Sequence, residues 1–136
     1  MRRLFIAIAL GGLVATATTA EDPGSNEAPS IAAAELHAQR EAGVAPTVID
    51  VRTSEEYASG HIPGAVNIPF DEVAQRIAEI EAPHGVALYC MVGPRARKGE
   101  AALLAAGHET VFHLEGGLAA WQAAGLPVEG GPTLAD

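Results

Sequence analysis

The amino-acid sequence predicts an α/β fold in which helices cover both faces of a mostly parallel central sheet. Short apolar runs rich in β-branched residues alternate along the chain with helical patterns, as where 47–51 is followed by 53–60. These runs are almost entirely apolar, which is typical of strands buried on both faces. Glycine follows several of the helical segments, where it ends a helix without steric cost.

The first part of the predicted domain contains one helix and one strand. Ser30 is a suitable N-cap for a helix that runs through about Ala42, and Gly43 is placed to end it. The run TVIDV at 47–51 is short, β-branched and apolar apart from Asp50. It therefore predicts a buried strand.

The middle part contains two helical patterns around a second strand. TSEEYASG at 53–60 predicts a short helix, because Thr53 or Ser54 can cap it, acids occupy its first turn and a glycine stops it. AVNI at 65–68 predicts a strand closed by proline. In FDEVAQRIAEI at 70–80 the apolar residues recur at helical spacing, which predicts an amphipathic helix.

The last part repeats the alternation twice. VALYC at 86–90 predicts a third strand, and alanine and leucine favour a helix from about 95 to 106 that Gly107 terminates. TVFHL at 110–114 predicts a fourth strand, and GLAAWQAAG at 117–125 a final helix. In such sheets ligands bind at the carboxyl ends of the strands, and the third strand ends at a cysteine.

The chain divides into four predicted segments. Residues 1–20 read as a secretory signal, because two arginines precede a short apolar run and small residues precede a cleavage site after Ala20. A polar lead-in rich in Pro, Gly and Ser is predicted over 21–29, a single domain over 30–128 and a flexible tail over 129–136. We therefore expect a periplasmic or secreted protein with no stable membrane association after signal cleavage.

Composition excludes several classes of function. The formal net charge is −9, which argues against nucleic acid and anionic membrane surfaces as partners. The single cysteine cannot form an internal disulfide. The histidines show no ligand spacing with the cysteine or with one another, so we predict no metal site.

Cys90, in the stretch YCMVGPR, is the candidate nucleophile. A free thiol is largely protonated at neutral pH, so a reactive cysteine needs nearby positive charge or hydrogen-bond donors. The start of the following helix and the cation Arg95 supply both. Gly93 is expected to let the loop turn tightly at a positive φ, so that an exposed loop of N–H groups from Met91 to Arg95 forms an anion-binding bowl. A buried, inert cysteine is the alternative interpretation.

Three motifs in order resemble the rhodanese family of sulfurtransferases: VIDVRTSEEYASGHIPGAVNIP, CMVGPR and LEGGLAAWQAAGLPV. The resemblance covers about 30–128. It implies a rhodanese-like α/β fold and a cycle in which Cys90 takes sulfur from a donor such as thiosulfate and passes it to a thiophilic acceptor, cyanide or a thiol. The implied cycle requires no cofactor. Met91, Val92 and Gly93 would bind the substrate through the backbone, and Arg95 would bind the donor oxyanion.

Two residues of the loop depart from the family pattern. Pro94 has no N–H, so the bowl has one donor fewer, and Ala96 stands where many relatives have a hydroxyl residue. Both changes are expected to weaken thiosulfate turnover without abolishing persulfide formation. The alternative function is therefore a sulfur carrier or persulfide relay that docks a protein acceptor.

Phosphatases of the same fold use a longer loop in which arginine follows cysteine after five residues. Position 96 would have to be arginine and is alanine, so phosphatase chemistry is disfavoured. Asp50 and Arg52 are predicted to form a hydrogen-bonded ion-pair cluster beside the bowl, together with the glutamates that follow them. His61 is a candidate for a supporting position near the site.

Overall fold

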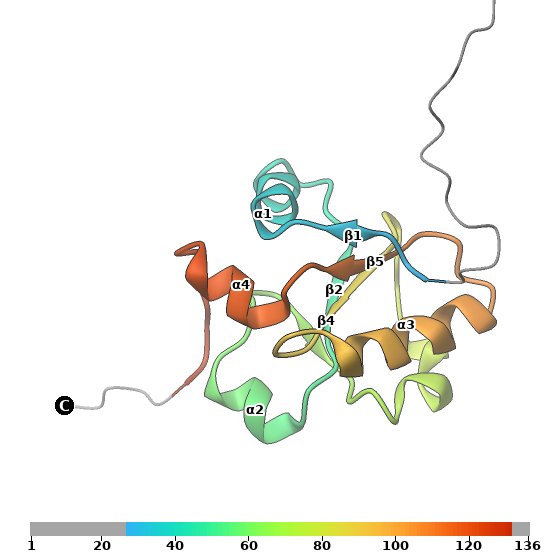
Figure 1. The fold of residues 1–136 in the computed structure, drawn as a ribbon. Coiled ribbons are helices and arrows are strands. Elements are labelled where there is room, and N and C mark those ends of the chain that lie inside the picture. Colours follow the sequence, from blue (N-terminus) through green and yellow to red (C-terminus); the bar gives the residue numbers. More distant parts are fainter. Residues whose placement is uncertain (1–26, 132–136) are drawn as a thin grey trace, which may run out of the picture.

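The computed structural model describes residues 27–131 and contains one five-stranded sheet in the order β1-β5-β4-β2-β3 (Figure 1). Every strand pairing is parallel. The elements, in chain order, are β1 (Ser30–Ile31), α1 (Ala33–Glu41), β2 (Thr47–Asp50), α2 (Ser54–Ser59), β3 (Val66–Asn67), η1 (Val73–Gln75), η2 (Ile77–Glu79), β4 (Val86–Tyr89), α3 (Pro94–Ala105), β5 (Val111–Leu114) and α4 (Gly117–Ala123). The predicted α/β class with a parallel sheet is confirmed.

Helical segments cover both faces of the sheet (Figure 1). On one face α3 and the two 3-10 segments pack against an apolar cluster that contains Ile49, Leu88 and Val111. On the other face α1 and α4 contribute Leu36 and Trp121 to a second cluster. All four residues of β4 are buried, since this central strand lies between both clusters. The continuous apolar run in β4 therefore reflects burial on two faces.

The predicted helix α2 is confirmed in its details. Thr53 is the N-cap, its hydroxyl accepts a hydrogen bond from the Glu56 N–H, and the Glu56 side chain returns to the Thr53 N–H. This reciprocal capping box satisfies two donors that a helix start would otherwise leave free. Gly60 is the C-cap.

The start of α1 differs from the prediction. Ser30 does not cap the helix, because it lies in β1 and pairs with His113 of β5. The helix begins at Ala33, and its N-cap, Ala32, makes no side-chain cap bond. A lone two-residue edge strand has no periodic signature, and the propensity of serine for caps pointed to the wrong element. Gly43 ends the turn at a φ of +73°, as expected.

The amphipathic helix predicted over 70–80 is wrong. This segment forms the two short 3-10 helices η1 and η2, separated at Arg76, where φ is −115° and ψ is 16°. The apolar residues of the pattern nevertheless pack against the core: Phe70, Val73, Ile77 and Ile80. Two short turns also bring these side chains against the core, so spacing alone does not distinguish them from one continuous helix.

The packed body extends past both ends of the predicted 30–128 segment. Ala28 is buried, and the neighbouring Pro29 carbonyl accepts a hydrogen bond from the His113 N–H at 2.9 Å. Glu129 pairs with His61 in an antiparallel bridge, and the Gly131 N–H donates to the Ala58 carbonyl at 2.7 Å. The predicted signal and most of the predicted lead-in and tail lie outside the described residues. No helix within 27–131 has the length and apolar character needed to cross a membrane.

Candidate active site

Cys90 lies directly after β4, at the carboxyl edge of the sheet. The loop from Cys90 to Gly93 connects β4 to the start of α3, and Figure 1 shows it beside the start of α4. Carboxyl ends of parallel strands converge with helix starts at this edge, so loops from distant parts of the sequence meet there.

The start of α4 holds the cysteine loop through two backbone hydrogen bonds. The N–H of Leu118 donates to the Cys90 carbonyl at 2.9 Å, and the N–H of Ala119 donates to the Met91 carbonyl at 3.1 Å. Gly117 has a φ of +59°, and a Cβ there would lie 2.5 Å from the Cys90 carbonyl oxygen. Only glycine allows this approach. The GG motif therefore fixes the loop that carries the thiol.

These contacts also set the direction of the loop's N–H groups. A trans peptide unit directs its C=O and the following N–H to opposite sides. Since the carbonyls of Cys90 and Met91 face α4, the N–H groups of Met91 and Val92 face away from it. Pro94 occupies the first turn of α3, where the N–H groups of Arg95 and Ala96 have no acceptor within the helix.

The thiol is more buried than the sequence suggested. Cys90 is 1% exposed and belongs to the same apolar cluster as Ala96. The exposed part of the loop consists of Met91 and Val92, which are 37% and 61% exposed. The site is therefore a recessed cysteine next to two exposed apolar residues, in place of the open bowl that was expected.

Gly93 lies in a bend but does not have the positive φ that was predicted. Its φ is 160°, close to extended backbone and outside the left-handed region. A Cβ at this position would lie 3.5 Å from Nε2 of His113, an ordinary packing distance. Gly93 is the N-cap of α3, and the Arg97 N–H donates to its carbonyl at 3.2 Å. The structural role of Gly93 is therefore to begin α3, and its φ is not a reason for glycine at this position.

Arg95, the predicted anion-binding residue, is already paired. Its Nη1 and Nη2 donate to Oε1 and Oε2 of Glu56 at 2.6 and 3.0 Å. The two side chains are about one-third exposed. The hydrogen bonds from Arg95 lower the pKa of Glu56 from its ordinary value of 4.5 to about 2. Glu56 therefore remains ionised at neutral pH, and the guanidinium is neutralised before any ligand binds.

Asp50 and Arg52 form a separate and fully buried pair. Arg52 Nη2 lies 2.7 Å from Asp50 Oδ2, and the Arg52 N–H and Nε also donate to the carboxylate. The Tyr89 hydroxyl donates to Asp50 Oδ2 at 2.8 Å. Burial of the ring, and then the charge of Asp50, raise the pKa of Tyr89. The predicted ion-pair cluster is present for Asp50 and Arg52, whereas Glu56 pairs with Arg95.

His61, the candidate for a supporting position near the site, contacts α2 and the chain that follows α4. Its Nδ1 is 2.7 Å from the Tyr57 carbonyl, its ring stacks on the Tyr57 ring, and Nε2 is 3.3 Å from the Glu129 carboxylate. It joins α2 to the chain after α4. Within residues 27–131 no group of three or more His, Cys, Asp or Glu side chains is arranged to hold a metal ion.

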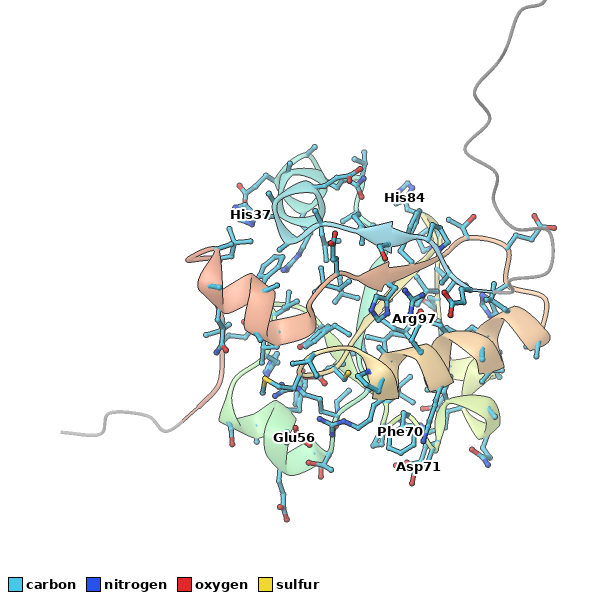
Figure 2. The ribbon with its side chains drawn as sticks, in the orientation of Figure 1. His37, Glu56, Phe70, Asp71, His84 and Arg97 are labelled. Carbon is cyan, nitrogen blue, oxygen red and sulfur yellow. The ribbon has the colours of Figure 1, made fainter. Side chains whose placement is uncertain are left out.

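Sequence reasoning missed the partner of Arg95. The capping-box spacing of Thr53 and Glu56 predicts that Glu56 lies at the start of α2, but it contains no information on which cation faces it. Figure 2 shows Glu56 on α2, on the side of the molecule that carries the β4–α3 loop. The pair exists because both helices start at the same edge of the sheet.

A central parallel sheet, a cysteine loop at its carboxyl edge and a glycine-rich helix start that holds this loop define a rhodanese-like domain. Residues 32–124 match the rhodanese-like domain family. This protein belongs to that family.

Proteins similar to this chain are named for different functions. The chain is 37% identical over 81 residues to a sulfurtransferase of Allochromatium vinosum, with 60% of this chain and 76% of the relative covered. It is 41% identical over 121 residues to an HTH-type transcriptional regulator of Mycobacterium tuberculosis, with 88% of this chain covered. The chain spans about half, 53%, of that regulator's length.

The fold also matches solved structures. The rhodanese-like domain of an Anabaena protein, solved by NMR, is 36% identical and superimposes with a TM-score of 0.68. The match covers 75% of this chain and 79% of that domain. Both the sequence family and the three-dimensional arrangement thus agree on the class of domain.

Proposed function

We propose that this protein is a sulfurtransferase that carries sulfane sulfur on Cys90. The observation that supports this most directly is the arrangement of the β4–α3 loop, in which the Cys90 and Met91 carbonyls are bound by α4. That orientation leaves the N–H groups of Met91 and Val92, with those at the start of α3, available to an anion. The same groups stabilise a thiolate and a persulfide.

The proposed cycle has two steps. The Cys90 thiolate attacks the outer sulfur of a donor such as thiosulfate, a new S–S bond forms, and the old S–S bond breaks with its electron pair leaving on sulfite. The product is a Cys90 persulfide anion. A thiophilic acceptor, cyanide or a thiol, then attacks the outer sulfur, and the electron pair of the Cys90 S–S bond returns to the thiolate. No oxidant is consumed.

The Arg95–Glu56 pair supports a second candidate function. A small dianion such as thiosulfate must share or displace a bidentate carboxylate at 2.6 and 3.0 Å to reach the guanidinium. Pro94 removes a further donor, and the exposed Met91 and Val92 suit contact with a protein surface. These features favour a persulfide relay that receives or delivers sulfur through a docked protein and turns over free thiosulfate slowly.

One experiment separates the two functions. Purified protein is incubated with thiosulfate, the mass of the protein is measured, and thiocyanate release is followed after cyanide is added. A gain of one sulfur atom with rapid thiocyanate release supports the enzyme, and the same gain with slow release supports the relay. No gain of sulfur from thiosulfate or from a low-molecular-weight persulfide contradicts both.

Replacing Cys90 tests the nucleophile. Because the thiol is buried in an apolar cluster, Cys90→Ala is the better-matched variant, and Cys90→Ser places a hydroxyl in apolar surroundings. Both should lose sulfur transfer by about 1000-fold or more. Circular dichroism and thermal melting serve as the control for folding. Transfer at the wild-type rate in a folded Cys90→Ala protein would remove Cys90 from the mechanism.

We also propose that the protein acts outside the cytoplasm, from the signal predicted over residues 1–20. Mass spectrometry of the protein recovered from a Gram-negative host tests this. An N-terminus near Glu21 in the periplasmic fraction is expected. Full-length protein confined to the cytoplasm would contradict it.

A further inference from the structure

Two ionisable side chains are buried between α3 and β5, and the proposed sulfur transfer uses neither. Glu100 of α3 is 1% exposed, and His113 of β5 is 7% exposed. Glu100 Oε2 lies 2.6 Å from Nδ1 of His113. Burial of two such groups is costly unless each is paired, so their position within the core requires a specific arrangement.

The surrounding contacts give this pair a fixed geometry. Arg97 Nη1 lies 3.2 Å from the other Glu100 oxygen, and it donates to the Ala28 carbonyl at 2.8 Å. Arg97 extends from α3 toward the strands (Figure 2). The backbone N–H of His113 donates to the Pro29 carbonyl at 2.9 Å. The carboxylate is thus held from two sides, and it fixes the plane of the imidazole.

The opposite edge of the imidazole faces the cysteine loop. A Cβ added to Gly93 would lie 3.5 Å from Nε2 and 3.6 Å from Cε1 of His113. Gly93 is both the last residue of the loop that begins at Cys90 and the N-cap of α3. The imidazole therefore lies beside Gly93 at the end of this loop, at a distance that would just admit a methyl group between them.

We propose that His113, oriented by Glu100, is a positioning residue for the Cys90 loop. It acts through Gly93: the ring limits how far the loop can move toward β5, and so keeps the N–H groups of the loop and of the start of α3 directed at the sulfur. This inference rests on the proposed role of Cys90. A positioning role would explain why a carboxylate and an imidazole are buried at a place in the core where apolar side chains could pack equally well.

Two substitutions of His113 separate the two edges of the ring. The amide nitrogen of Asn takes the position of Nδ1 along the side chain, so His113→Asn retains the contact with Glu100 but leaves space beside Gly93. The amide nitrogen of Gln takes the position of Nε2, so His113→Gln keeps a group beside Gly93. A residue that served only to hydrogen-bond Glu100 would tolerate Asn at least as well as Gln.

The first measurement is the rate at which iodoacetamide alkylates Cys90 across a range of pH, which reports thiol reactivity without any sulfur donor. The second is the rate of Cys90 persulfide formation at increasing thiosulfate concentration, followed by mass. His113→Asn should lower both maximal rates by about 10- to 100-fold, because small displacements of catalytic donors have effects of this size. The thiosulfate concentration at half-maximal rate should change little, and His113→Gln should recover most of the loss.

Thermal melting of each variant is the control, and both should remain folded at the assay temperature. Wild-type rates in folded His113→Asn would overturn the inference, as would equal losses in the Asn and Gln variants. If the wild-type thiol is readily alkylated but accepts no sulfur from any donor, the proposed function fails. The role of His113 is then decided by the alkylation rates alone.

Discussion

Two carboxylate–guanidinium pairs lie near the carboxyl edge of this sheet, and their surroundings differ. Asp50 and Arg52 are 0% and 2% exposed, and the Tyr89 hydroxyl and the Gly60 carbonyl also bind the pair. The side chains of Glu56 and Arg95 are about one-third exposed, and they join α2 to the start of α3. Both pairs join a carboxylate to an arginine, but only the second pair is within reach of solvent and ligands.

Burial explains the division of roles. A buried pair is strongly coupled to folding, because removing one partner leaves an uncompensated charge in a medium of low dielectric constant. A partly exposed pair contributes little to stability, because water screens it, and its arginine can exchange one anion for another. We therefore assign the first pair to the fold, and we propose that in the second pair Glu56 competes with the sulfur donor for Arg95.

The largest effect on stability is expected at the buried pair. Arg52→Ala leaves the Asp50 carboxylate buried without its main partner, and the free energy of unfolding should fall by about 3–5 kcal/mol. Urea denaturation monitored by circular dichroism measures it. Arg95→Ala is the control, and its loss should be about 1 kcal/mol or less. Equal losses in the two variants would show that burial does not separate the pairs.

A smaller effect is expected when Tyr89 loses its hydroxyl. Tyr89→Phe removes the donor to Asp50 and the acceptor of the Ile62 N–H, which lies 3.1 Å from the hydroxyl oxygen. The free energy of unfolding should fall by about 1–3 kcal/mol, since buried polar groups are left unpaired. Thermal and urea unfolding test this. An unchanged stability would mean that water replaces the hydroxyl in the buried cluster.

The exposed pair should affect the donor more than the fold. Glu56→Gln removes the competing carboxylate from Arg95, so the KM for thiosulfate should fall by about three- to tenfold, which corresponds to roughly 1 kcal/mol of binding free energy. Thiocyanate release at varied thiosulfate concentration measures KM. Glu56→Gln in an Arg95→Ala background should have no such effect. An unchanged KM in the single variant would show that Arg95 does not bind the donor.

The smallest predicted effect is a pH dependence of stability. The pKa of Glu56 is lowered to about 2 by Arg95, so the stabilisation by this carboxylate is fully present above about pH 4.5 and is lost as the pH falls through 2. The difference in unfolding free energy between wild type and Glu56→Gln should therefore be constant above pH 4.5 and shrink below it. Urea unfolding at a series of acidic pH values tests this. A constant difference throughout would contradict the role of the ion pair.

Much of the fold was predictable because its signals are local. The apolar runs that became β2, β4 and β5 and the capping box at Thr53 depend on neighbouring residues only. The family resemblance likewise came from three short motifs. The failures occurred where local signals have two solutions: 70–80 buries its apolar residues in short turns, and Ser30 pairs with β5 although serine favours caps.

The candidate site was predictable only in part, for the same physical reason. Cys90 and Arg95 could be proposed as site residues because their spacing lies within one loop. Three features depend on contacts between residues 13 to 39 positions apart or on the whole core: the burial of Cys90, the pairing of Arg95 with Glu56, and the position of His113 beside the cysteine loop. No local pattern specifies which distant charge faces which.

The sequence by itself determined the class of domain and the position of the candidate nucleophile, Cys90, after a central strand, because strand periodicity, helix caps and loop spacing are encoded by adjacent residues. The tertiary structure decided which charged side chains are buried, which arginine is paired with a carboxylate and which side chain lies beside the end of the cysteine loop. Those outcomes arise when parallel strands bring loops from distant segments to one edge of the sheet, where burial determines how strongly each charged side chain interacts with its partner.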